Sequence, residues 1–323
     1  KVEIEKRKKI EEESRLAEIK RKRELEIATK NKEETEIKLA TEEFTTTYEG
    51  EGEGEGSVKE YEEVLNRFKI FLSELIGDNI ELIDGFNHGQ GGLIIIVTIN
   101  GSKQILKISL ESPRNEQSCN REKAEFDILQ EINRIGSDIT VKVYPPFLCI
   151  TDIRSIVGIQ IFLRRLEEIS SSPHVRGVLP ENKIIKIPGD WTFLDKWWSQ
   201  HPTTLSFSII RMEYVEGISL REAFIRNNNI EFKKTLEDFR TKVNRLHEGG
   251  IYHCDLHSGN IIVQDTDNSV RIIDFGQAKR KQFETPAPWS EQIHCPASES
   301  IPQEMVEEHC PRPYDKSAKS CNS

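Results

Sequence analysis

The segments IYHCDLHSGNIIV, residues 251–263, and RIIDFG, residues 271–276, decide how this chain is interpreted. They contain an acid at Asp255, an amide five residues later at Asn260, and a second acid at Asp274 after an apolar run. Mg²⁺ prefers this kind of oxygen ligand, namely one or two carboxylates completed by phosphate oxygens. The two segments therefore predict a site for a magnesium nucleotide, in which Asp255 can also accept a proton from an attacking hydroxyl.

Three other segments upstream contain polar groups that such a site needs. The strand-like QILKI contains Lys107, and the helical REKAEFDILQEI contains Glu125 eighteen residues later. The glycine-rich NHGQGG, residues 87–92, ends fifteen residues before Lys107. Its backbone amides can approach a phosphate closely, although Asn87 replaces a glycine in the pattern G-x-G-x-x-G.

Together with RMEYVEGISL at residues 211–220, these motifs resemble the protein-kinase-like superfamily in order and nearly in spacing. The resemblance runs from about Ile80 to Gly276. It implies ATP and Mg²⁺ as cofactors, with Asp255 as the catalytic base and Lys107 on the α- and β-phosphates. It also implies that Asn260 and Asp274 hold the metal.

The same resemblance implies a set of ATP-binding residues. Glu125 would be the ion-pair partner of Lys107, and Met212 would lie at the back of the adenine pocket. Two alternatives stay open, because Glu122 is a rival on the same helix and Glu125 can instead pair with a base of that helix. The implied ATP-binding residues are Asn87, Gly89, Gly91, Gly92, Lys107, Glu125, Met212, Glu213 and Val215.

Two residues depart from the usual protein-kinase pattern. Cys254 stands where many protein kinases have Arg, which predicts that control by a phosphorylated activation loop is missing. His257 stands where serine/threonine kinases usually have Lys, and this loop is similar to aminoglycoside phosphotransferases and to haspin-type kinases. His257 then either contacts a phosphate or the substrate, or fixes the loop through a hydrogen bond.

These features predict a two-lobed α+β fold of the protein-kinase-like kind. Because 47 residues follow Gly276 and no convincing A-P-E motif is present, we expect a reduced C-lobe. Residues 145–205, with three tryptophans, are expected to form an insertion that packs on the lobe.

The leading functional hypothesis is an ATP- and Mg²⁺-dependent phosphotransferase, namely an atypical serine/threonine-protein kinase. One alternative is a small-molecule phosphotransferase similar to aminoglycoside or choline kinases, because of His257 and the expected small C-lobe. A second alternative is a pseudokinase or truncated kinase that acts as an interaction module.

The N-terminal part of the chain differs in composition from the rest. Residues 1–44 contain thirteen Lys or Arg and thirteen Glu, which predicts an exposed mixed-charge helix, open to a coiled-coil or other helix-mediated partner. Residues 45–57 contain an alternating Glu-Gly run at 49–56 and predict a flexible linker. We expect the kinase-like domain at 58–290, with its N-lobe at about 58–215 and C-lobe at about 216–290, and a loose tail at 291–323.

Composition excludes several classes of protein. The 323 residues have a formal net charge of −10 and a pI near 5.5, which argues against a nucleic-acid ligand. The longest apolar run, Gly92–Ile99, is shorter than the roughly 20 residues that span a bilayer, so no membrane partner is expected. Six scattered cysteines and no opening apolar segment predict an intracellular, cytoplasmic protein.

Periodicity predicts the elements that connect these motifs. The expected hairpin turn is Asn100-Gly101, and residues 85–92 are expected to form a loop. Helices are expected at 61–76, 121–135 and 232–247, and strands at 80–83, 93–99, 104–108, 209–214, 260–264 and 270–273.

Overall fold

The computed structural model describes residues 2–45, 57–89, 92–111, 119–186, 206–226 and 231–280. The chain divides into two compact units that do not follow the order of the sequence. The first consists of residues 1–77, 110–115 and 150–207, and the second of residues 78–109, 116–149 and 208–323. Every residue of the predicted site belongs to the second unit. The domain boundaries expected from composition stay predictions.

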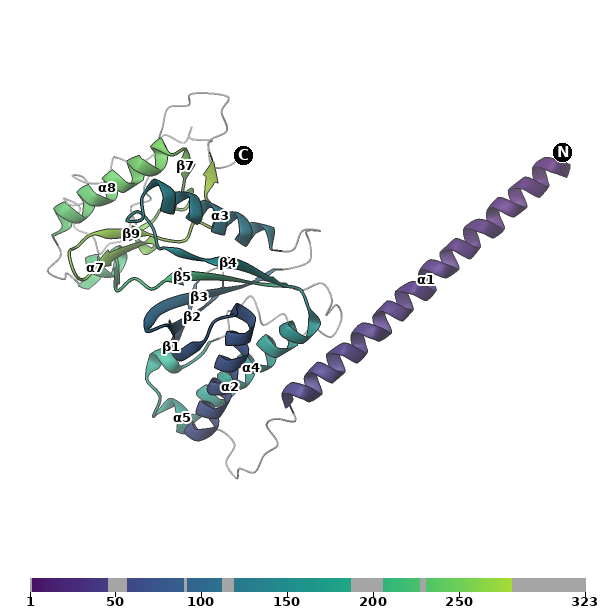
Figure 1. Cartoon of the computed structure of the whole chain (residues 1–323), viewed down its shortest axis with the longest axis horizontal. Helices are drawn as coiled ribbons and strands as arrows, with labels where there is room; N and C mark the ends of the chain where they lie inside the picture. The colour runs from purple at the N-terminus through teal and green to yellow at the C-terminus, as the bar shows by residue number, and fades with distance from the viewer. Residues whose placement is uncertain are drawn as a thin grey trace. The chain divides into compact units, whose positions relative to one another are not determined.

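The first unit is helical. Its helices are α1 (Val2–Thr45), α2 (Val58–Ile76), α4 (Ile153–Ser171), the short α5 (Pro173–Arg176) and the 3₁₀ turn η2 (Glu181–Lys183). Helix α4 packs against both α1 and α2 (Figure 1). The ring of Phe44, near the end of α1, lies 5.6 Å from Phe71 and 5.7 Å from Phe162, and all three side chains are buried. The C-terminal end of α1 is therefore anchored by aromatic packing.

The predicted charged N-terminal helix is confirmed as α1. Glu18 and Lys22 form one of its expected ion pairs at 3.1 Å, and both side chains are largely exposed. Leu16, Leu25 and Leu39 are at least 60% exposed along the helix, and the spacing of nine residues between Leu16 and Leu25 does not fit a heptad. A coiled coil or a helix-mediated partner stays a prediction. No helix among the described residues is long and apolar enough to cross a membrane.

A five-stranded sheet forms the first part of the second unit. Its strands are β1 (Ile80–Gly89), β2 (Gly92–Ile99), β3 (Ser102–Glu111), β4 (Val143–Ile150) and β5 (Ser206–Glu213), in the order β1-β2-β3-β5-β4. The predicted turn between β2 and β3 is confirmed, because Asn100 and Gly101 have φ values of 51° and 71°, as a two-residue hairpin requires. Helix α3 (Asn120–Ile135) follows β3 (Figure 1).

The second part of this unit contains helices and short strands. They are α7 (Leu220–Arg226), α8 (Phe232–Glu248), the sheet of β6 (Gly217–Ser219), β8 (Ile261–Gln264) and β9 (Val270–Ile272), the pair β7 (Ile251–Tyr252) and β10 (Lys279–Arg280), and the 3₁₀ turn η5 (Ser258–Asn260). One buried apolar cluster joins both parts, with Leu129 of α3, Ile210 of β5 and Phe239 of α8 among its members. The predicted α+β class is confirmed.

The predicted loop and the predicted insertion are wrong in their bounds. Residues 85–89, expected in a glycine loop, continue β1 to Gly89, because pairing with β2 outweighs the low strand propensity of glycine. Residues 145–150, expected in the insertion, complete β4. Strand β4 lies at the edge of the sheet, where Pro145 and Pro146 can be accommodated. The tryptophans of the expected insertion, and the expected C-terminal tail, lie outside the described residues.

A disulfide that the sequence did not indicate joins Cys119 to Cys149. Cys119 is the residue before α3, where its side chain makes no capping hydrogen bond and its φ is 63°. Cys149 lies on the edge strand β4. The start of α3, the helix that contains Glu125, is thus tied covalently to the sheet. The sequence predicted no cysteine pairing, and the expected intracellular location stays a prediction.

Replacing Cys149 with Ser is expected to lower the free energy of unfolding by about 2–4 kcal/mol, because the bond closes a loop with a sequence separation of 30 residues. Urea unfolding of the oxidised protein measures the loss. Reductant is expected to lower the stability of the wild-type protein by a similar amount and to leave Cys149→Ser unchanged. Equal midpoints for oxidised wild type and Cys149→Ser would contradict the structural role of the bond.

Candidate active site

The centre of the candidate site is an ion-paired cluster of three predicted residues. Lys107 Nζ lies 2.8 Å from Glu125 Oε1 and 2.9 Å from Glu125 Oε2, and it lies 3.4 Å from Asp274 Oδ1. The side chains of Lys107 and Glu125 are 13% and 5% exposed, whereas that of Asp274 is 45% exposed. The cluster therefore has a buried pair on one side and a partly exposed carboxylate on the other.

The elements explain why these residues meet. Lys107 lies in the middle of β3, paired with Ile94 of β2, and its neighbours Leu106 and Ile108 are fully buried. Glu125 lies on the buried side of α3. The structure pairs Lys107 with Glu125 and not with its rival Glu122, whose Oε2 is buried without a hydrogen-bond partner in the described part of the chain.

The two acids around Lys107 control its ionisation. Burial lowers the pKa of the ammonium, but the negative charges of Glu125 and Asp274 and their hydrogen bonds outweigh burial, so the pKa is raised. A lysine whose pKa is higher in the folded state than in the unfolded state stabilises the fold. This stabilisation is fully present at pH values below the pKa that the lysine has in the unfolded chain. That contribution is lost only as the pH rises through the raised value. Lys107 is therefore a permanent cation at neutral pH.

A fully buried histidine connects the two acidic segments. The backbone N–H of Asp255 donates to His253 Nδ1 at 3.3 Å, and His253 Nε2 lies 2.9 Å from the carbonyl oxygen of Ile273. Because Nδ1 accepts, the ring proton is on Nε2, which donates to Ile273. His253 thus fixes Asp255 relative to the residue that precedes Asp274.

Asn260 provides a second connection between the same segments. Its side-chain Nδ2 donates to the backbone carbonyl of Asp255 at 3.0 Å, and its own carbonyl accepts from the N–H of Ile273 at 2.9 Å. The amide oxygen of Asn260 is therefore the side-chain atom that remains for another ligand. Gln277 Nε2 donates to Asp255 Oδ2 at 3.1 Å and so orients that carboxylate.

Two site residues adopt left-handed backbone conformations. Cys254 and Asp274 have φ values of 59° and 63°. Such conformations cost non-glycine residues roughly 1–3 kcal/mol and cluster at functional sites. Both lie next to the hydrogen bonds of His253, which indicates that the surrounding network holds them in place.

His257 has a structural role in its loop. Its Nδ1 accepts a hydrogen bond from the backbone N–H of Gly259 at 3.1 Å, which caps the turn η5 that ends at Asn260. Of the two roles expected for His257, the structure therefore contains the hydrogen bond that fixes the loop.

The segment RMEYVEGISL begins in β5 and leaves it after Glu213. Met212 is buried in the apolar cluster, and Val215 packs against that cluster. Glu213 binds Lys142 through two hydrogen bonds, its N–H donating to the Lys142 carbonyl at 2.8 Å and its Oε2 accepting from the Lys142 N–H at 3.0 Å. These contacts anchor the end of β5 beside the residue that precedes β4.

The described part of the glycine-rich segment lies at the end of β1 and the start of β2, which pair with each other. Asn87 is exposed and pairs with Ile94, and Gly89 pairs with Gly92, while Gly91 lies outside the described residues. A Cβ atom on Gly92 would lie 2.3 Å from the carbonyl oxygen of Ile108. Gly92 therefore has a packing reason to be glycine, and a role of these residues at a phosphate stays a prediction.

The donor set suits a hard cation beside a nucleotide. The Asp274 carboxylate and the remaining Asn260 amide oxygen are the oxygen ligands that Mg²⁺ accepts, and Lys107 offers a fixed positive charge to phosphate oxygens. Asp255, oriented by Gln277 and His253, is a carboxylate that can accept a proton. His253 and Gln277 were not in the predicted set. The H-x-D spacing could have identified His253, whereas Gln277 had no comparable signal.

Comparison with known proteins covers the part of the site that contains Asp255, Asn260 and Asp274, and not the part with Lys107 and Glu125. A family model described as "Protein kinase domain" matches residues 194–307. A probable serine/threonine-protein kinase of Clostridium acetobutylicum is 39% identical over 80 residues, which are 24% of this chain and 12% of that protein. The KEOPS complex subunit Bud32 of Pyrococcus abyssi is 38% identical over 71 residues, which are 22% of this chain and 31% of that protein.

A third relative, the serine/threonine-protein kinase D of a Synechocystis species, is 31% identical over 86 residues. Those residues are 27% of this chain and 17% of that protein. The chain thus spans less than a third of the length of each of these relatives.

Proposed function

We propose that the chain is an ATP- and Mg²⁺-dependent kinase of atypical type, because a protein-kinase-domain model matches residues 194–307 and the similar proteins include serine/threonine-protein kinases. The acceptor in this proposal is the hydroxyl of a serine or threonine in another protein. The observation that supports it best is the hydrogen-bonded path from Glu125 through Lys107 to Asp274, and from Ile273 back to Asn260 and Asp255.

Each of these residues has a distinct role in the proposal. Lys107, held by Glu125, binds the α- and β-phosphates of ATP, and the connection after Met212 binds the adenine. Asn260 and Asp274 hold Mg²⁺, which when bound neutralises phosphate charge. Asp255 orients the acceptor hydroxyl and takes its proton, while Gln277 and His253 keep that carboxylate and its backbone in position.

Most of the catalysis would come from positioning and charge. Phosphoryl transfer requires little covalent chemistry from the protein, so a fixed ammonium and fixed oxygen ligands matter most. The buried Lys107–Glu125 pair meets this requirement, because each side chain is held in one place by the other. A pseudokinase is less well supported, since all of these groups are present.

A protein acceptor is supported by the names of the relatives, two of which are serine/threonine-protein kinases. His257, which suggested a small-molecule acceptor, is accounted for by its hydrogen bond within the loop. The atypical status rests on Cys254, because no arginine stands there to answer a phosphorylated loop.

Mg²⁺-ATP is expected to raise the melting temperature of the protein, because a ligand that binds only the folded state stabilises it. At one hundred times the dissociation constant the gain is about 2.7 kcal/mol, which corresponds to roughly 5–10 °C for a domain of this size. Differential scanning fluorimetry with Mg²⁺ alone, ATP alone and both measures it. No additional shift with both present would count against either enzyme hypothesis and favour the pseudokinase.

A further inference from the structure

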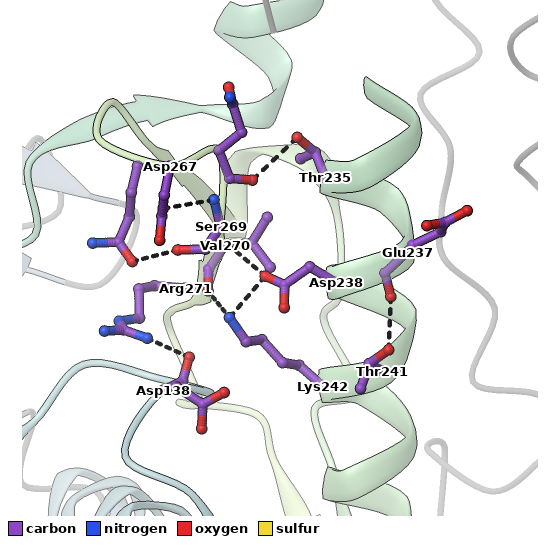
Figure 2. A network of polar contacts seen from close by, with 12 residues as sticks. Asp138, Thr235, Glu237, Asp238, Thr241, Lys242, Asp267, Ser269, Val270 and Arg271 are labelled. Atoms are coloured by element: carbon purple, nitrogen blue, oxygen red, sulfur yellow. Dashed lines mark hydrogen bonds and ion pairs between the residues drawn. The ribbon is translucent and has the colours of Figure 1, made fainter. Parts of the chain in front are cut away.

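Helix α8 binds the β8–β9 hairpin through a network of polar side chains, shown in Figure 2. Thr235 Oγ1 donates to the carbonyl of Asn268 at 3.2 Å, at the turn of the hairpin. One and two helical turns further along, Asp238 and Lys242 reach the first residue of β9. Positions 235, 238 and 242 are three and four residues apart and so share one face of α8.

Asp238 and Lys242 bind both backbone groups of one residue. The N–H of Val270 donates to Asp238 Oδ2 at 2.8 Å, and Lys242 Nζ donates to the carbonyl of Val270 at 2.8 Å. The same two side chains form an ion pair at 2.8 Å (Figure 2). Asp238 and Lys242 together bind the N–H and the carbonyl of Val270, which would otherwise be able to pair with another strand. We refer to Asp238 and Lys242 as the α8 clamp.

The burial of Lys242 shows that the clamp is more than a surface ion pair. The Lys242 side chain is 3% exposed, whereas Asp238 is 29% exposed. A buried ammonium is costly unless it is paired and hydrogen-bonded, and here a carboxylate and a carbonyl meet that requirement. Such a group is tolerated only where β9 lies at one fixed position against α8.

The strand that the clamp holds leads directly to the candidate metal ligand. Strand β9 has three residues, and Asp274 follows its last residue by two positions. The N–H of Ile272 donates to the carbonyl of Ile139, and the N–H of Ile273 donates to the carbonyl of Asn260, both at 2.9 Å. A shift of Val270 along or away from α8 would strain both bonds and displace Asp274.

We propose that Asp238 and Lys242 are positioning residues for Asp274, acting through the backbone of β9. The clamp fixes where β9 lies, and β9 fixes the carboxylate that contacts Lys107. The role of Asp274 as a metal ligand in this proposal rests on the proposed function. The contact between the α8 clamp and β9 is independent of the proposed function.

The first test is amide hydrogen exchange of the nucleotide-free protein. Lys242→Met keeps the length of the side chain and removes the donor to Val270. We expect it to speed exchange of the Ile272 and Ile273 amides by about tenfold or more, as a local loss of stability does. The matched control is Thr241→Ala, because Thr241 on the same helix bonds only to the Glu237 carbonyl in Figure 2. Unchanged exchange at Ile272 and Ile273 in Lys242→Met would overturn the proposal.

The second test measures the Mg²⁺ concentration that half-saturates phosphoryl transfer at a fixed ATP concentration. Loss of a group that holds a metal ligand in place typically costs roughly 10–100-fold in metal affinity or activity, and the clamp acts on Asp274 in this way through the backbone of β9. We therefore expect at least a tenfold rise for Lys242→Met and no change for Thr241→Ala. A lowered melting temperature with an unchanged Mg²⁺ requirement would show a merely structural role and overturn the proposal.

The double variant Asp238→Asn/Lys242→Met separates positioning from the cost of an unpaired charge. It leaves no unpaired buried charge, and its amide oxygen can still accept from Val270. We expect its melting temperature to recover toward wild type while the Mg²⁺ requirement and the Ile272 exchange rate stay raised. If the Mg²⁺ requirement and the Ile272 exchange rate also recovered to wild-type values, the proposal would be overturned. If wild type transfers no phosphate, the proposed function fails, while the exchange rates still decide whether the clamp holds β9.

Discussion

Replacing Asp274 with Asn is expected to reduce phosphoryl transfer by roughly 10²–10³-fold, the loss seen when one charge-stabilising group is removed from a preorganised site. The change keeps the shape of the side chain and removes its negative charge. Lys107 retains Glu125 at 2.8 Å, so the fold is expected to persist. The rate of γ-phosphate transfer at saturating ATP and Mg²⁺ measures the effect, and thermal unfolding confirms that the variant is folded.

Asp265→Asn is a suitable control for this change. Asp265 is an exposed carboxylate in the turn after β8, and its replacement alters the net charge by the same amount. We expect it to leave the transfer rate within twofold of wild type. If Asp274→Asn also kept its rate within tenfold, Asp274 would not be a metal ligand and the site would have to be assigned differently.

The sequence predicted much of the fold, because several of its signals depend on local chemistry. Gly77 ends α2 in a left-handed conformation, as its place after Ile76 indicated. Asn100 and Gly101 make the predicted turn for the same reason. The bounds of β1 and β4 could not be predicted, because they depend on neighbouring strands. Cross-strand pairing holds residues 85–89 in β1, and an edge position tolerates the prolines of β4.

The sequence predicted the residues of the candidate site by number, and the structure was needed to decide between Glu122 and Glu125 as the partner of Lys107. Glu122 and Glu125 are three residues apart on one face of α3, so the spacing alone cannot choose between them. The structure pairs Glu125 with Lys107. The assignments of catalytic, metal-binding and ATP-binding roles stay predictions until the variants are measured.

Contacts between segments that are distant in the sequence could not be predicted from the sequence. Lys242 lies in FKKTLEDFRTKVNRLHE, where a lysine is ordinarily read as a solvated charge, and only the packing of α8 on β9 buries it. The pairing of Cys119 with Cys149 is of the same kind, because it depends on where α3 begins relative to β4.

Replacing Asp255 with Asn is expected to reduce transfer to a protein acceptor by roughly 10²–10⁴-fold, the usual contribution of a positioned general base. Asn keeps an oxygen that can accept from Gln277, and the backbone bonds of Asp255 to His253 and Asn260 do not involve the side chain. Nucleotide binding should therefore survive. Mg²⁺-ATP is expected to raise the melting temperature of Asp255→Asn as it does for wild type, which separates loss of chemistry from loss of binding.

The proposed kinase activity is tested by incubating wild type and Asp255→Asn with γ-labelled ATP, Mg²⁺ and a generic protein substrate, with aminoglycoside and choline acceptors in parallel. We expect Mg²⁺-dependent label on serine or threonine of the protein substrate with wild type, and at least a hundredfold less with Asp255→Asn. Label on the small alcohols alone would contradict the protein acceptor. No Mg²⁺-dependent transfer by wild type, or equal transfer by Asp255→Asn, would contradict the proposed kinase activity itself.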